Sequence, residues 1–250
     1  MQDDQMTIVS NESVARNTYE MVLQSEHVSQ TAIPGQFLHI AIPNFTLRRP
    51  LSIATINREK ETVTIVYKVV GAGTKQLSTF REGVALNVMG PNGNGFDLEI
   101  NEKTTVLLIG GGVGIPPLHF LGKQLSEKGV TVKSILGFQS QEDIFYENSF
   151  KTFGKTLIVT DDGSYGKKGL VTDVISEIND FDTYYTCGPL PMIQAVTKQL
   201  AHKEGYISLE ERMGCGIGAC YACVIPTTIG VDYRKICEDG PVFAAQEVKL

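Results

Sequence analysis

The chain has 250 residues, more than the usual ~100–150 of one domain, and this length predicts two or three compact units. Its 42% hydrophobic and 20% charged residues are typical of a globular protein. A net charge of −6, without any run of Lys and Arg, argues against nucleic acid as a partner. The polar, acidic start and the lack of a ~20-residue apolar run predict no secretory signal, no membrane segment and a cytoplasmic location.

Residues 1–97 contain short β-type runs, such as QFLHIAI and TVTIVYKVV, separated by turn formers. This spacing predicts an antiparallel barrel or sandwich. Within it, RRPLSI places Arg49 close to Ser52, and a guanidinium with a neighbouring hydroxyl suits a phosphate. The alternative is a solvated arginine pair on a strand. Tyr67, in VYKVVGAGT, would either stack on a ring or belong to a strand face.

Residues 98–205 alternate apolar strands with helical patterns, which predicts a parallel sheet covered by helices. The expected strands are TTVLLIGGG, VTVKSILGF, KTLIVTDDG and TYYTCGP. The expected helices are PPLHFLGKQLSEKG, LVTDVISEI and LPMIQAVTKQLAHKEG.

Two of these strands end in turns that suit a dinucleotide, because glycines let the backbone and a helix N-terminus approach a pyrophosphate. The residues of the two turns are Gly110, Gly111, Gly112 and Gly114, then Cys187, Gly188 and Pro189. A tight strand-to-helix turn without a ligand is the alternative. No Arg or Lys for a ribose 2′-phosphate directly follows the second strand, which favours NAD over NADP.

Residues 206–250 have too little apolar content for a core of their own and carry four of the five cysteines. These four are Cys215, Cys220, Cys223 and Cys237. C-x4-C-x2-C followed by a distant Cys is the plant-type spacing of a [2Fe–2S] cluster, and the glycines between them suit a loop wrapped around it. Structural zinc and free thiols are the alternatives.

No residue is predicted to act as an acid, base or nucleophile. The four histidines form no metal-spaced pair, and each is expected at the surface or packed in the interior: His27, His39, His119 and His202. Glu210 and Glu211 are expected to form a solvated acidic face.

The motifs RRPLSI, YKVVGAGT, GGGVGIPP and CGPLPM together resemble the ferredoxin reductase family. The tail LEERMGCGIGACYACVIPT is similar to that of the electron-transfer subunits of NAD-dependent (type B) dihydroorotate dehydrogenases, a likeness that covers essentially the whole chain. The resemblance implies a β + α/β fold class in three parts. They are an antiparallel FAD-binding β-barrel (1–97), a parallel α/β NAD-binding domain (98–205) and a small [2Fe–2S] cluster subdomain (206–250).

The resemblance also implies roles for matched residues. Its flavin motif and further FAD contacts fall on Arg49, Pro50, Leu51, Ser52, Val66, Tyr67, Lys68, Gly73 and Thr74. Leu51 stands where many members have Tyr. The tail cysteines match the cluster ligands.

The function implied by the resemblance is that of an oxidoreductase subunit in pyrimidine (UMP) biosynthesis. Electrons would pass from dihydroorotate through FMN on a separate catalytic subunit, then through [2Fe–2S] and FAD, to NAD⁺. The partner's (β/α)₈ barrel needs about 250 residues of its own, so the substrate site is expected on a second polypeptide. The resemblance implies a complex with two of each chain. The alternatives are a reductase module of another complex, such as a hydrogenase-associated reductase, and a nucleotide-sensing module stapled by zinc.

Overall fold

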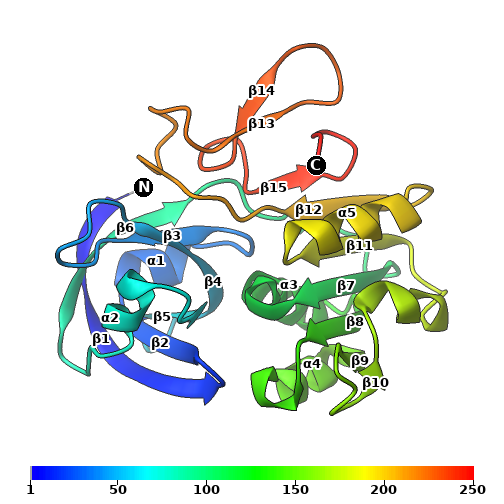
Figure 1. Cartoon of the computed structure of the whole chain (residues 1–250), viewed down its shortest axis with the longest axis horizontal. Coiled ribbons are helices and arrows are strands. Elements are labelled where there is room, and N and C mark those ends of the chain that lie inside the picture. Colours follow the sequence, from blue (N-terminus) through cyan, green and yellow to red (C-terminus); the bar gives the residue numbers. More distant parts are fainter. Residues whose placement is uncertain (1) are drawn as a thin grey trace.

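The computed structural model describes residues 2–250, which form a closed barrel, a sheet domain with helices on both faces and a C-terminal tail that lies over both (Figure 1). The predicted fold class is confirmed. Within this part of the chain, no helix has the length and apolar character needed to cross a membrane.

Six antiparallel strands close the barrel in the order β1-β2-β5-β4-β3-β6. The barrel strands are β1 Gln2–Ala15, β2 Thr18–Gln24, β3 Phe37–Ile40, β4 Arg49–Asn57, β5 Thr62–Lys68 and β6 Ala85–Asn92, and the connecting helices are α1 Glu26–Thr31 and α2 Ala72–Leu77. Along β3 the side chains alternate, as the pleat of a strand requires. Leu38 and Ile40 enter the barrel core, whereas Phe37 packs with the tail. Strand β3 therefore connects the barrel to the tail.

The second domain is built on a seven-stranded sheet in the order β10-β9-β8-β7-β11-β12-β15, parallel except for β15. Its strands are β7 Thr105–Gly111, β8 Thr131–Phe138, β9 Gly154–Thr160, β10 Lys167–Lys168, β11 Thr183–Cys187, β12 Glu204–Ser208 and β15 Val242–Ala244. Its helices are α3 Ile115–Glu127, α4 Glu147–Phe153 and α5 Leu190–Gln199, with the 3₁₀ helices η1 Gly112–Gly114, η2 Gln141–Asp143 and η3 Val171–Glu177.

The strand order places the two predicted nucleotide turns side by side. From β7 the chain proceeds outward through β8 and β9, and it then returns to β11 on the opposite side of β7. The last residue of β11, Cys187, lies opposite Gly110 of β7. In an open parallel sheet, this reversal of strand order leaves a crevice at the carboxyl ends of the strands, where such folds bind ligands.

Two local predictions were wrong. The helical pattern LVTDVISEI forms the 3₁₀ helix η3, and the helix expected over residues 190–205 ends at Gln199, so that residues 204–208 form strand β12. A side chain at Gly205 would collide with the Tyr184 ring, 2.1 Å from an added Cβ, so packing against β11 decides this segment. The domain limits stay a prediction, although β12 runs across the one at 205/206.

The tail lacks a core of its own, as its composition indicated. It contains the hairpin β13 Val224–Pro226 and β14 Tyr233–Lys235. Its buried Cys223 and Cys237 share a hydrophobic cluster with Phe37 of the barrel and with Ile193 and Ile207 of the sheet domain. The other two domains therefore hold the cysteine region in place.

A shared core also joins the barrel to the sheet domain. Ala54 and Val66 of the barrel are buried in the same hydrophobic cluster as residues of α3. From α3, His119 Nδ1 donates to the Ala54 carbonyl oxygen over 2.9 Å, and its Nε2 then accepts from Ser149 Oγ at 2.7 Å. Burial lowers the pKa of His119, which agrees with this neutral ring.

Candidate functional site

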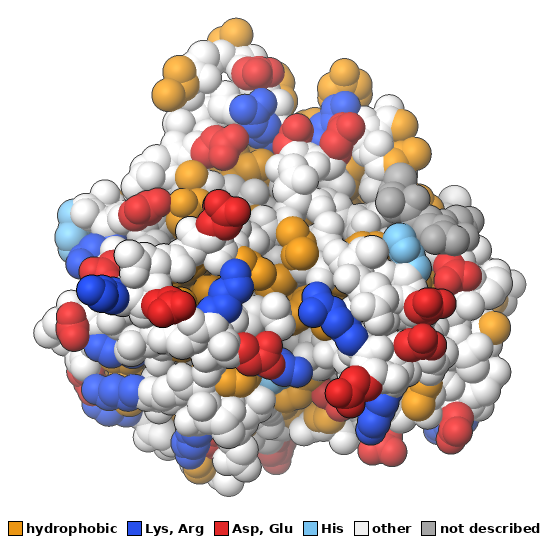
Figure 2. Space-filling model, turned by 180° about the vertical axis from the view of Figure 1, so that it is seen from behind, with side chains coloured by type: hydrophobic (Ala, Val, Ile, Leu, Met, Phe, Trp, Pro, Cys, Tyr) orange, Lys and Arg blue, Asp and Glu red, His pale blue; other side chains and the backbone are white. Residues whose placement is uncertain are grey.

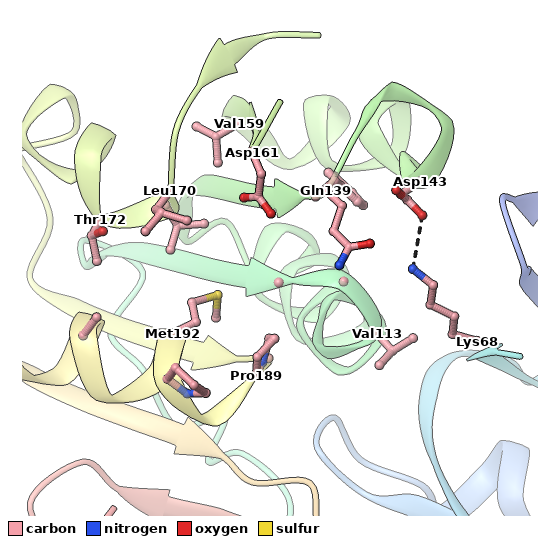
Figure 3. A pocket seen from close by; sticks show the side chains of 18 of the residues that line it. Lys68, Val113, Gln139, Asp143, Val159, Asp161, Leu170, Thr172, Pro189 and Met192 are labelled. Atoms are coloured by element: carbon pink, nitrogen blue, oxygen red, sulfur yellow. Dashed lines mark hydrogen bonds and ion pairs between the residues drawn. The ribbon is translucent and has the colours of Figure 1, made fainter. Parts of the chain in front are cut away.

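A cleft of about 480 Å³ opens where β7 and β11 end (Figure 3). Gly111 and Gly112 line it from the first predicted turn, and Gly188 and Pro189 line it from the second. Gly112 has φ +52, and a Cβ added there would meet nothing within 4 Å, so its backbone is open to a ligand. Both the position and the volume suit a nucleotide.

The other residues of the two turns form the wall behind this cleft. A Cβ on Gly114 would lie 2.4 Å from the carbonyl oxygen of Cys187, so glycine lets the turns pack backbone against backbone. A Cβ on Gly110 would lie 2.8 Å from the Ile115 side chain. Cys187 is fully buried, and burial, reinforced by the charge of Glu210, raises the pKa of its thiol. The thiol is therefore protonated at neutral pH.

A second cleft, of about 400 Å³, lies on the barrel beside β4 and β5. The predicted flavin residues that line it are Arg49, Pro50, Leu51, Ser52, Val66, Tyr67, Lys68 and Thr74. Gly73 does not line it but lies behind Arg49, whose Nη2 would be 2.8 Å from a Cβ on Gly73. The Arg49 guanidinium carbon lies 5.3 Å from the centroid of the Phe45 ring. Arg49 is thus held between a glycine and an aromatic ring, in a cleft that also contains the Ser52 hydroxyl, which suits a phosphate.

Two neighbouring side chains are mainly structural. Arg48 donates from Nη1 to the carbonyl oxygens of His39 and Asn87, each at 3.2 Å, and so links β3 to β6. Tyr67 is only 1% exposed, and its ring stacks on Tyr19 with the centroids 5.8 Å apart. Tyr67 thus belongs to the barrel core and also lines the cleft, and its contact with a flavin stays a prediction.

The two clefts meet at Lys68, Val113 and Glu210, which line both of them. Glu210 is exposed at the mouth of both clefts, and desolvation raises the pKa of its carboxyl group to about 7. Glu210 and Glu211 are both exposed, as expected from the sequence. A group that changes charge near neutral pH stands where ligands of the two clefts would meet.

Lys68 also ties the barrel to the sheet domain through Asp143. Its Nζ lies 3.1 Å from Asp143 Oδ1, and Arg16 Nη2 lies 2.5 Å from Oδ2. Figure 3 draws the ion pair between Lys68 and Asp143 as a dashed line. Asp143 is buried and also accepts a 3.0 Å hydrogen bond from Ser140 Oγ. Burial acts to raise the pKa of Asp143, but these three hydrogen bonds outweigh it and hold the pKa below its usual value.

Replacing Asp143 with Asn is expected to lower the free energy of unfolding by about 1–3 kcal/mol at pH 7, because two cations lose their buried partner. The folded pKa lies below the unfolded one, so the carboxylate stabilises the fold above its unfolded pKa and ceases to do so as the pH falls through the folded pKa. Urea unfolding should therefore show a smaller difference in the free energy of unfolding between the wild type and Asp143→Asn at about pH 3.5 than at pH 7. Glu142→Gln, at an exposed partner of Arg16, is the control. An equal difference at both pH values would contradict this role.

The four tail cysteines lie in two neighbouring pairs, Cys215 with Cys220 and Cys223 with Cys237. A [2Fe–2S] cluster takes four thiolates on two irons, so two pairs fit it. Residues 2–250 contain no group of three or more His, Cys, Asp or Glu side chains that is placed to hold a metal ion.

Backbone N–H groups of the cysteine loop point at the sulfurs. Ile217 N and Cys220 N donate to Cys215 Sγ at 3.5 and 3.3 Å, and Gly218 N donates to Cys237 Sγ at 3.2 Å. Burial acts to raise the pKa of Cys215, but hydrogen bonds led by these two lower it to about 7. Gly218 has φ +74, which favours glycine. The loop backbone therefore favours the thiolate form of Cys215, whereas burial raises the pKa of the Cys237 thiol to about 12. N–H groups aimed at the sulfurs fit the predicted cluster.

Sequence reasoning missed much of both cleft walls. Phe138, Gln139 and Asp161 line the sheet-domain cleft from the ends of β8 and β9. The rule that parallel strands present ligand residues at their carboxyl ends would have found them. Residues 209–213, which connect β12 to the cysteine loop, line the barrel cleft, and no local pattern indicates this.

These features define a class of protein: a ferredoxin reductase-type oxidoreductase, with a barrel cleft and a nucleotide cleft that meet. The solved NADH-dependent reduced ferredoxin-NADP oxidoreductase, described for flavin-based electron bifurcation, is 32% identical with a TM-score of 0.90, covering 98% of this chain and 90% of that one. The ferredoxin reductase in carbazole 1,9a-dioxygenase, 19% identical with a TM-score of 0.70, covers 81% of this chain and 66% of that one. It shows the fold alone.

The particular family follows from sequence relatives. Residues 210–249 match the iron-sulfur cluster binding domain of dihydroorotate dehydrogenase B. The electron transfer subunit of dihydroorotate dehydrogenase B (NAD(+)) from Shouchella clausii is 52% identical over 98% of this chain and 97% of its own length. Its counterpart from Bacillus velezensis is 49% identical over the full length of both. The chain belongs to this family of electron transfer subunits, which confirms the predicted family. Neither relative's name mentions a hydrogenase, the partner in the alternative function.

Proposed function

We propose that this chain carries electrons from a dihydroorotate-oxidising partner to NAD⁺, as the electron-transfer subunit of a type B dihydroorotate dehydrogenase in pyrimidine (UMP) biosynthesis. Its cofactors are FAD in the barrel cleft, NAD(H) in the sheet cleft and a [2Fe–2S] cluster in the cysteine loop. A flavin exchanges two electrons at once with a nicotinamide and single electrons with a cluster, which is the conversion this function needs.

The convergence of three sites carries the proposal. The two clefts share Lys68 and Glu210, so ligands bound in them would meet. Phe37 of β3 lines the barrel cleft and is buried in the same cluster as Cys223 and Cys237. The cysteine loop is therefore seated beside the flavin cleft, as electron transfer between the two requires.

The chain works with a separate catalytic subunit, as the family name states. We propose that this partner holds FMN, that the complex contains two of each chain and that it is cytoplasmic, where thiols stay reduced for a cluster. Hydrophobic side chains gather at the tip of the tail (Figure 2), where Ile229 is 87% and Val231 is 97% exposed. Tyr221, inside the cysteine loop, is 77% exposed. Exposed apolar side chains on the tail that carries the cysteines suit the docking of the partner.

The test is a visible spectrum of the anaerobically purified chain, with flavin, iron and sulfide assays, before and after NADH is added. We expect one FAD and about two irons per chain. NADH should bleach the visible absorption of both the flavin and the cluster. A colourless chain that holds zinc and no flavin would contradict the proposal.

The docking surface is tested in the complex with the double variant Ile229→Asp and Val231→Asp. This variant should weaken co-purification of the FMN subunit, while NADH should still bleach the flavin of this chain as in the wild type. Val9→Asp, on the barrel surface, is the matched control.

A further inference from the structure

Strand β3 presents a buried histidine to the cysteine loop. His39 is 0% exposed, and a Cβ built on Gly216 would lie only 2.3 Å from its Nδ1, so the ring packs directly on the backbone that follows Cys215. Gly216 has φ +72, which again favours glycine. Only glycine at position 216 therefore leaves room for the His39 ring.

The His39 ring has no hydrogen-bond partner of its own in residues 2–250. Neither Nδ1 nor Nε2 is bonded, although both are buried. The Arg48 main chain lies near the ring but does not reach hydrogen-bond geometry. A buried N–H left without an acceptor costs free energy, so native proteins rarely keep one. His119, the other buried histidine, has both ring nitrogens bonded.

The ring is neutral and so offers one N–H. Burial, followed by the charges of Arg48 and then Arg49, lowers the pKa of His39 to about 4. No cysteine Sγ accepts from the ring. An acceptor from outside the protein would therefore serve the ring, and the cysteine loop, which packs on the ring at Gly216, would enclose such a group.

His39 also lies beside Phe37, which joins the barrel cleft to the tail. The Phe37 and His39 rings meet edge to face, with the centroids 6.4 Å apart. Phe37 lines the flavin cleft and packs with Cys223 and Cys237. A change at His39 therefore affects the seating of the cysteine loop on the barrel.

We propose that His39 is a positioning residue for the iron–sulfur cluster, donating its ring N–H to a sulfide of the cluster and thereby holding the loop on the barrel and raising the cluster potential. The proposal rests on the proposed function, because it needs the tail cysteines to hold a [2Fe–2S] cluster. A hydrogen bond to sulfur stabilises the reduced, more negative state more than the oxidised one, which is why it raises the potential.

The first test is an EPR-monitored redox titration of the full chain with FAD and cluster. For His39→Leu, the ratio of reduced to oxidised cluster at a fixed ambient potential should fall about tenfold. His39→Asn, which keeps an N–H near Nδ1, should restore most of that ratio. Leu38→Val lies on the same strand but faces the barrel core, so it should loosen the barrel without changing the ratio.

The second test uses the wild-type chain and does not depend on the folding of a variant. Pulsed EPR of protein grown with ¹⁵N-histidine should show ¹⁵N coupled to the reduced cluster. No coupling, together with an unchanged ratio in His39→Leu, would overturn the role of His39 while leaving the cluster in place. A chain that binds no iron would instead overturn the proposed function, and this inference with it.

Discussion

Replacing Cys220 with Ser should stop electron transfer to the FMN partner while leaving the flavin reaction intact. Cys220 lies next to Cys215 and is only half-buried, so the substitution removes a ligand without opening the core. Iron should fall well below two per chain, and dihydroorotate-dependent NAD⁺ reduction in the complex should fall at least ~100-fold. NADH should still reduce the FAD at a rate close to that of the wild type.

Ala222→Ser is the matched control, because it adds a hydroxyl at an exposed position of the same loop and should keep both iron and activity. Dihydroorotate-linked NAD⁺ reduction that survived in an iron-free Cys220→Ser complex would refute the proposed electron path. Removing residues 206–250 would be a poorer test. That deletion would also remove most of β12 and all of β15 from the sheet, so a loss of NADH binding would be ambiguous.

The parts of the fold that sequence predicted well are those in which local pattern and tertiary role agree. The run TVTIVYK is rich in β-branched residues and forms β5, and the glycines after TVLLI mark the end of β7. The cysteine spacing by itself predicts a cluster, because ligand spacing is set by chemistry rather than by packing.

Other features could not be predicted, because they depend on which distant segments meet. Glu210 follows an ordinary strand, and only the strand order brings it to the junction of both clefts. His39 sits in a plain β-type run, and nothing in that run indicates that Gly216 will pack on its ring. Helical periodicity around residue 205 was overridden by packing on Tyr184. Such contacts between segments distant in sequence determine much of the site.

Replacing Gly114 with Ala should impair the reaction with NADH while sparing both redox groups. The new Cβ would lie 2.4 Å from the Cys187 carbonyl carbon and oxygen and from Gly188 N, all backbone atoms that cannot rotate away. The turns after β7 and β11 must then separate, which widens the crevice where the nucleotide is expected. A shift of about 1 Å there should lower kcat/KM for NADH about 10–100-fold. FAD and iron content should not change, because their predicted residues lie on other elements.

Gly129→Ala separates the collision from the effect of losing a glycine. Gly129 has φ +82 and open space around it, so alanine there should cost about 1 kcal/mol of stability through backbone strain alone. Steady-state kinetics with NADH and ferricyanide should then show a normal kcat/KM for Gly129→Ala and a reduced one for Gly114→Ala. If Gly114→Ala used NADH as well as the wild type does, the crevice between β7 and β11 would not be the nucleotide site. The contact of the two turns would then serve only the packing of the sheet domain.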